Sequence, residues 1–137
     1  MRLAHVVLFA LAACGGEPPA VAPARPCVDA EADALRRMRA HFHLAEGDTA
    51  GFSPSPTTVD LDHDGQPDRI YTFELGGASL TVVYAMQEAC GQPMGEIDGP
   101  VTVLRTTNRG FSDLRVTQGA SWKICRVGED GYRCTEP

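Results

Sequence analysis

The chain has 137 residues, of which 22% are charged and 43% are hydrophobic, and its formal net charge is −6. An acidic chain has no electrostatic basis for binding nucleic acid or an anionic lipid surface, so no nucleic-acid partner is expected. No apolar run reaches the ~20 residues that a membrane-spanning helix needs.

The first residues, MRLAHVVLFALAACGG, have the order of a secretory signal peptide. Arg2 provides a positive start, an unbroken apolar run follows, and small residues precede a cysteine. The sequence Leu11-Ala12-Ala13-Cys14 resembles the lipobox of bacterial lipoproteins, and this resemblance covers only about the first 15 residues. It implies that residues 1–13 are removed and that Cys14 is acylated.

The lipobox resemblance also implies a location. A multiply acylated Cys14 would anchor the protein to a membrane of the bacterial cell envelope without spanning it. Gly15 follows the cysteine, which by the same resemblance favours the outer over the inner membrane, with the protein facing the periplasm or the cell surface. Residues 14–26 are rich in proline and form a predicted tether that extends ~3 Å per residue. The alternative is an ordinary secreted protein in which Cys14 has no role.

Four further cysteines remain, an even number that predicts two disulfides in an exported chain. The sequence alone leaves three pairings open. The segment ICRVGEDGYRC reads as a hairpin, and a turn at 129–130 places Cys125 opposite Cys134, whereas a turn one residue later shifts the register. We therefore favour Cys125–Cys134, which leaves Cys27–Cys90. Neither pair has the CxxC spacing of a zinc site.

The predicted fold class is α+β, a small, mainly antiparallel β-sheet domain over residues 27–137 with one N-terminal helix. Residues 28–43 are acidic at the start and basic at the end, as suits a helix. Leu35, Met38 and Phe42 mark its buried stripe. The helix is expected to pack on one face of the sheet.

A loop is expected over residues 46–56, and the remainder of the chain reads as strands. About six short strands are expected, and residues 91–100 are expected to be a connection. The predicted strands cover residues 69–75, 79–86, 101–106, 121–127 and 132–135, and residues 108–117 are expected to be a turn that leads into a further strand.

The stretch VDLDHDGQPDRI contains four aspartates at close spacing: Asp60, Asp62, Asp64 and Asp68. Calcium prefers six to eight oxygen ligands, and carboxylates at alternate positions of a tight turn can converge on one centre. Gly65 allows the required bend because glycine adopts positive φ at little cost. The pattern therefore predicts a calcium loop, with a metal-free acidic turn as the alternative.

The loop is not an EF-hand, because Tyr71 occupies the position where that loop has glutamate and the residues that follow read as a strand. It resembles the calcium loop of FG-GAP/VCBS repeats, which occur in integrin-type β-propellers. The resemblance covers about a dozen residues and the following strand, and one such loop cannot build a propeller. It implies a structural Ca²⁺ ion held by the carboxylates of Asp60, Asp62, Asp64 and Asp68 and by the backbone carbonyl of Gln66.

Other residues that could carry chemistry are interpreted structurally. His41 and His43 lie two residues apart on a helix and do not face each other. His63 is expected to point into solvent, and Trp122 is expected to belong to the core.

No catalytic residues are predicted. The chain has neither G-x-S-x-G nor H-E-x-x-H, and its cysteines are expected to be oxidised. We therefore expect a non-enzymatic lipoprotein with a binding or architectural role in the envelope. A second hypothesis is an inhibitor or accessory subunit that binds an exported protein. A third is a metal-dependent hydrolase that uses the acidic loop.

Overall fold

The computed structural model describes residues 26–49 and 54–137, so the predicted signal peptide, Cys14 and almost all of the predicted tether lie outside the described residues. Within these ranges, no helix has the length and apolar character to cross a membrane. The elements are α1 (Ala30–Phe42), a 3₁₀ helix (Glu46–Thr49), β1 (Thr57–Val59), β2 (Asp68–Leu75), β3 (Ala78–Gln87), β4 (Cys90–Asp98), β5 (Val101–Asn108), β6 (Phe111–Gln118), β7 (Ser121–Gly128) and β8 (Gly131–Thr135).

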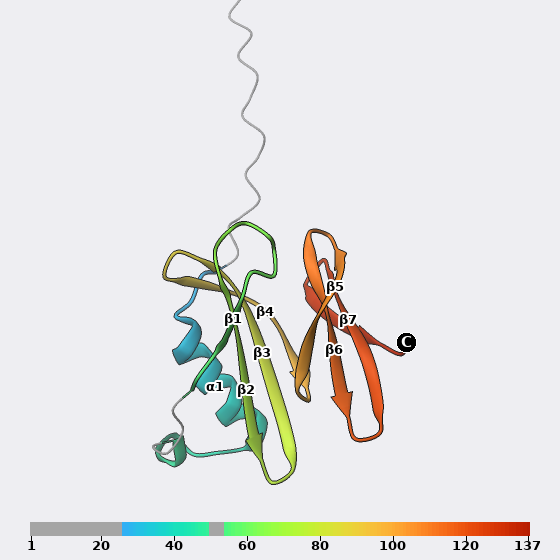
Figure 1. Cartoon of the computed structure of the whole chain (residues 1–137). Helices are drawn as coiled ribbons and strands as arrows, with labels where there is room; N and C mark the ends of the chain where they lie inside the picture. Colours follow the sequence, from blue (N-terminus) through green and yellow to red (C-terminus); the bar gives the residue numbers. More distant parts are fainter. Residues whose placement is uncertain (1–25, 50–53) are drawn as a thin grey trace, which may run out of the picture.

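The strands form two antiparallel four-stranded sheets, each built from consecutive strands: sheet A from β1 to β4 and sheet B from β5 to β8. Helix α1 covers one face of sheet A, and sheet B packs against the other face, as Figure 1 shows. The α+β class, the antiparallel pairing and the N-terminal helix are confirmed. The expectation of one sheet is wrong, because the last four strands form a sheet of their own.

Strand β3 shows why sheet A is buried on both faces. Its residues from Leu80 to Met86 are all buried, whereas a strand with one solvated face would alternate between buried and exposed positions. Leu80, Val82 and Tyr84 face the helix, and Val83 and Ala85 face sheet B.

Helix α1 begins where Asp29 accepts a hydrogen bond from the backbone N–H of Ala32 at 3.0 Å, the usual role of an N-cap aspartate. Ala30, Ala34 and Met38 form its buried face. The small alanines let the helix approach the sheet closely. The predicted stripe is thus confirmed in part, since Met38 is buried and Leu35 and Phe42 are partly buried.

A cluster of hydrogen bonds and ion pairs joins this helix to sheet A. Asp33, which is 8% exposed, accepts hydrogen bonds from Arg36 and Arg37 at 2.6 Å and from the hydroxyl of Tyr84 at 2.7 Å. Burial raises the pKa of Asp33, but the hydrogen bonds from Arg37, Tyr84 and Arg36 outweigh it and lower the pKa overall. Arg37 also reaches Glu96 on β4 at 3.2 Å.

The connection predicted over residues 91–100 is wrong, because most of it belongs to strand β4. Its glycines and Pro93 obscured the strand, but β4 lies at the edge of sheet A, where proline is tolerated. The register shifts between Val83 and Tyr84, at a bulge in the β3–β4 pairing. Met94 and Ile97 point into the core between the sheets.

Both disulfides are present, Cys27–Cys90 and Cys125–Cys134. Cys125 and Cys134 lie directly opposite each other in the β7–β8 register, as the hairpin argument predicted. The other bridge joins the segment before α1 to the start of β4.

The two sheets approach closely where β8 begins. A Cβ atom added at Gly131 would collide with the backbone carbonyl oxygen of Met94. Gly131 also has φ +117°, a conformation that favours glycine. Glycine is therefore required here both for the turn and for the contact between β8 and β4.

Candidate metal centre

The acidic loop lies between β1 and β2, at the end of sheet A that adjoins the β5–β6 hairpin of sheet B (Figure 1). Its last aspartate, Asp68, is the first residue of β2 and is completely buried. Both of its carboxylate oxygens accept backbone hydrogen bonds: Oδ2 from Leu61 at 2.8 Å and Asp62 at 3.3 Å, and Oδ1 from Met86 at 2.8 Å. Asp68 therefore joins the loop to strand β3.

The other aspartates shape the turn through backbone hydrogen bonds. Asp60 accepts from the N–H groups of Asp64 at 3.2 Å and Gly65 at 2.9 Å, and Asp62 accepts from Asp64 at 3.2 Å. His63 and Gly65 adopt left-handed conformations, with φ 59° and 89°. This tight winding brings alternate side chains to one side of the loop.

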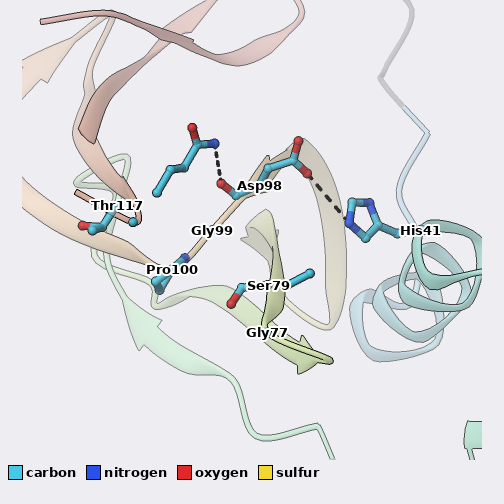
Figure 2. Close-up of a pocket in the computed structure, with 10 residues that line it drawn as sticks. His41, Gly77, Ser79, Asp98, Gly99, Pro100 and Thr117 are labelled. Carbon is cyan, nitrogen blue, oxygen red and sulfur yellow. Dashed lines mark hydrogen bonds and ion pairs between the residues drawn. The ribbon is translucent and has the colours of Figure 1, made fainter. Parts of the chain in front are cut away.

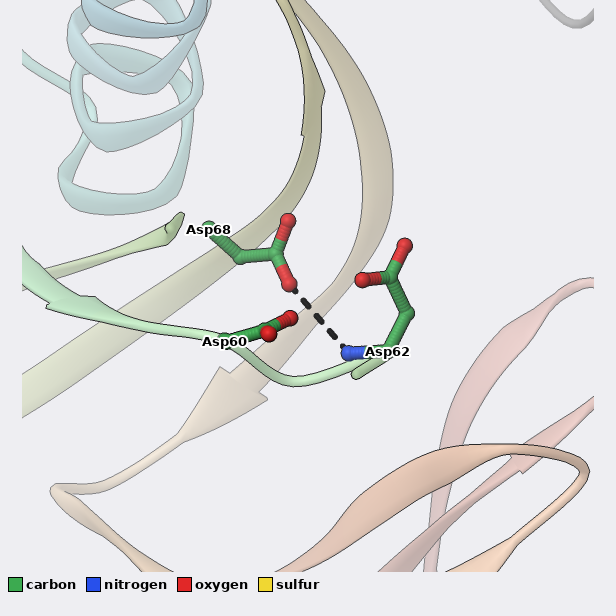
Figure 3. A group of neighbouring side chains, drawn as sticks. All are labelled: Asp60, Asp62 and Asp68. Carbon is green, nitrogen blue, oxygen red and sulfur yellow. Dashed lines mark hydrogen bonds between the residues drawn. The ribbon is translucent and has the colours of Figure 1, made fainter. Parts of the chain in front are cut away.

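Three carboxylates converge. Each of Asp60, Asp62 and Asp68 offers one oxygen, and these oxygens lie within 4.8 Å of one another. Figure 3 shows the three side chains pointing toward a common centre. Asp64 is not part of this group, and its carboxylate accepts the backbone N–H of Gln66 at 2.8 Å instead. Ligation by Asp64 and by the carbonyl of Gln66 remains a prediction.

The negative charge of the cluster has no basic side chain to offset it. Among the described residues, no arginine, lysine or histidine forms an ion pair with any of these aspartates. Burial, followed by the nearby charge of Asp68, raises the pKa of Asp62 to about 6. Burial also raises the pKa of Asp68. A bound cation would remove this repulsion.

The loop also joins sheet A to sheet B. The carbonyl of Leu61, a completely buried residue, accepts the backbone N–H of Ser112 on β6 at 2.8 Å. His63 Nε2 lies 3.2 Å from Ser112 Oγ, and Tyr132 Oη donates to the Ser112 carbonyl at 2.7 Å. His63 is exposed, as expected, but its ring nitrogen also contacts the second sheet. We call this set of contacts around Ser112 the clasp.

Apart from the acidic loop, a hollow lies at the end of α1. Among the described residues it contains no comparable cluster of metal-ligating side chains. It has a volume of about 530 Å³ and is lined mainly by backbone turns. As Figure 2 shows, His41 Nε2 faces Asp98 at 3.8 Å, and Gln118 donates to the Asp98 carbonyl at 2.8 Å. Ser79 also lines the hollow, but it forms no hydrogen bond with His41 in the described structure, so there is no assembled nucleophile and base.

Sequence reasoning did not identify Ser112, Tyr132 or Leu61 as part of the site. Leu61 carried a usable signal, since an apolar residue within an acidic turn indicates a buried contact. Ser112 and Tyr132 lie far from the loop in the chain and carried none. The comparisons of the chain with protein-family models, curated proteins and solved structures gave no match.

Proposed function

We propose that the protein is an exported, lipid-anchored and non-enzymatic component of the bacterial cell envelope, in which a structural Ca²⁺ ion bound to the acidic loop holds the two sheets together. The convergence of Asp60, Asp62 and Asp68 within 4.8 Å carries the metal part of this proposal. The lipobox resemblance at Cys14 carries the anchoring part.

The donor set favours calcium over other metals. Its side-chain ligands are carboxylates, which suit hard cations, and no cysteine or histidine belongs to the cluster among the described residues. Each carboxylate oxygen that accepts one N–H retains further lone-pair capacity for an ion. When bound, the ion would supply the positive charge that the loop lacks.

The proposed role is structural because of what the loop contacts. Asp68 joins it to β3, and Leu61 and His63 join it to Ser112 of sheet B. An ion that orders the loop would therefore strengthen the clasp. Affinity in the range of extracellular modules, about 10⁻⁴ to 10⁻³ M, would suffice where calcium is abundant.

Thermal melting of the oxidised protein tests the metal part. Calcium at about 100 times its dissociation constant should add about 2.7 kcal/mol to the free energy of unfolding, on the order of 10 °C in Tm for a domain of this size. The shift should be absent in Asp62→Ala and present in the control Glu74→Ala, an exposed acidic residue of β2 outside the cluster. A melting temperature that calcium leaves unchanged would contradict the metal part.

Metabolic labelling with a radioactive fatty acid tests the anchor. Wild-type protein should incorporate label and fractionate with membranes, and Cys14→Ser should lose both properties. Label retained in Cys14→Ser would contradict lipidation at this residue while leaving the calcium proposal intact.

A further inference from the structure

The outer face of sheet B carries an unusual combination of side chains. Leu114, Val116, Cys125, Val127 and Tyr132 face the core, so the alternating residues of β6, β7 and β8 point away from it. We define the arginine face as five of these outward residues: Arg115, Trp122, Ile124, Arg126 and Arg133.

The position of Trp122 differs clearly from the one that the sequence predicts. The sequence predicts a core position, yet the side chain is 43% exposed. It lies opposite Thr117 in the β6–β7 register, and Ile124 lies opposite Arg115. An exposed tryptophan with a neighbouring isoleucine forms an apolar centre in a charged surface, an arrangement common at binding interfaces.

The charge of the segment that forms sheet B differs from that of the preceding residues. Residues 101–137 contain six basic and four acidic residues, a net charge of +2, whereas residues 26–100 contain four basic and thirteen acidic residues, a net charge of −9. The arginine face is thus a basic surface on an acidic protein.

The arrangement of the arginines is unfavourable for the isolated fold. Arg126 and Arg133 lie directly opposite each other on β7 and β8, and like charges in that position destabilise a sheet. Arg126 is 54% exposed and lies 3.6 Å from the carboxylate of Asp113, while Arg133 pairs with the exposed Asp130 at the hairpin turn. The side chain of Arg115 forms no ion pair or hydrogen bond within the described part of the chain. An anionic partner would offset this repulsion.

We propose that the arginine face binds a short acidic polypeptide segment through charge complementarity around Trp122 and Ile124. This proposal is independent of the metal and of the lipid anchor. Tryptophan and arginine are enriched at the centres of protein–protein interfaces, and lysine is depleted there. The only lysine of the chain, Lys123, belongs to the alternate set of β7 positions and pairs with Glu136.

An acidic polysaccharide fits the face less well. Sugar hydroxyls require acceptors, and the one carboxylate on the outward side of β6, Asp113, is only 2% exposed and accepts from Thr106 at 2.7 Å. The free oxygen of Asp113, Oδ1, is buried and has no hydrogen-bond partner in the structure. No ligand hydroxyl can reach it without moving side chains.

The size of the face indicates a small interface. Strands β6, β7 and β8, about 4.8 Å apart and five to eight residues long, give roughly 350 Å², below the ~800 Å² per partner of a standard stable complex. The expected interaction is therefore transient, salt-dependent and directed to a short acidic stretch.

Trp122 provides a direct test, because it is the only tryptophan of the chain. Poly-L-glutamate is titrated into the purified oxidised protein while tryptophan emission is recorded. The ionic strength is kept low, so that the Debye length is about 10 Å or more. The expected result is a saturable change in emission that weakens when the salt concentration is raised. Arg126→Gln and Arg133→Gln should each weaken binding roughly tenfold, the loss typical of one charge-assisted contact.

The control is Arg39→Gln, which removes the same charge from α1, on the opposite side of sheet A. It should bind as the wild type does, and circular dichroism should show that all variants are folded. The proposal is overturned if poly-L-glutamate causes no saturable change, or if Arg39→Gln weakens binding as much as Arg126→Gln. Polygalacturonate is titrated in parallel, and binding as tight as that of poly-L-glutamate would overturn the assignment to a polypeptide.

Discussion

Replacing Asp62 with asparagine should stabilise the metal-free protein, whereas replacing Asp68 with asparagine should destabilise it. Both changes remove one carboxylate charge from the same cluster. The amide oxygen introduced by Asp62→Asn can still accept the N–H of Asp64, so this change mainly relieves repulsion and desolvation. The single amide oxygen introduced by Asp68→Asn cannot replace both carboxylate oxygens, which together accept three backbone N–H groups.

The expected changes in the free energy of unfolding follow from the raised pKa of Asp62 and from the burial of the two side chains. The pKa of Asp62 is raised from 3.8 to about 6, which corresponds to roughly 3 kcal/mol before solvent screening. Because Asp62 is half-buried, screening reduces the expected gain at neutral pH to about 1 kcal/mol. Asp68 is completely buried, and an amide NH₂ facing an N–H donor there costs about 2 kcal/mol.

The pH dependence provides a second check on Asp62. A carboxyl group with a raised pKa in the folded state binds protons more tightly when folded, so its ionisation destabilises the metal-free fold as the pH rises from 3.8 through about 6. The stability of the metal-free wild type should therefore rise as the pH falls from about 7 toward 4, and Asp62→Asn should lose part of this rise.

Urea unfolding in EDTA, at neutral pH and about two pH units lower, measures both effects. In saturating calcium the order of wild type and Asp62→Asn should reverse, because the variant loses a ligand. The reasoning fails if Asp62→Asn and Asp68→Asn destabilise the metal-free protein equally, since the cluster would then lack the repulsion inferred from its burial and charges.

Three further changes test the rest of the fold, each measured by chemical unfolding. Asp33→Asn should cost about 2 kcal/mol at neutral pH, and since the pKa of Asp33 is lowered in the folded state, its difference from wild type should shrink only as the pH falls below about 4. Gly131→Ala should cost at least about 2 kcal/mol more than Gly110→Ala, because both positions have positive φ but only the first has a backbone oxygen in the way; equal costs would contradict the close contact of the sheets. Loss of the Cys27–Cys90 bridge, whose cysteines are separated by 63 residues, should cost about 4 kcal/mol, against about 2.7 kcal/mol for the nine-residue hairpin bridge; the opposite order would contradict the chain-entropy argument.

Much of the local structure could be predicted from short-range patterns. The helix followed from its charge distribution, and the β7–β8 hairpin and its disulfide followed from the spacing of two cysteines around a turn. Strand β4 was missed because edge position and a bulge allow proline and glycine where strand propensity argues against them.

The candidate metal centre was predictable only in part, because some of its contacts depend on elements outside the loop. The spacing of the aspartates indicated a loop whose carboxylates converge, and three of the four do so. The spacing gave no indication that Asp68 accepts three backbone hydrogen bonds or that Asp64 turns toward Gln66. These outcomes depend on the position of β3 and on the detailed winding of the turn.

Patterns among residues close together in the chain were enough to predict the class of fold and the position of the acidic loop, and to favour the disulfide across the last hairpin. The tertiary structure alone decided that the strands divide into two sheets, that the loop reaches Ser112 of the second sheet, and that Trp122 faces outward. Because side chains alternate along a strand, the sequence shows that its two faces differ. Only packing against elements distant in the chain decides which face is buried.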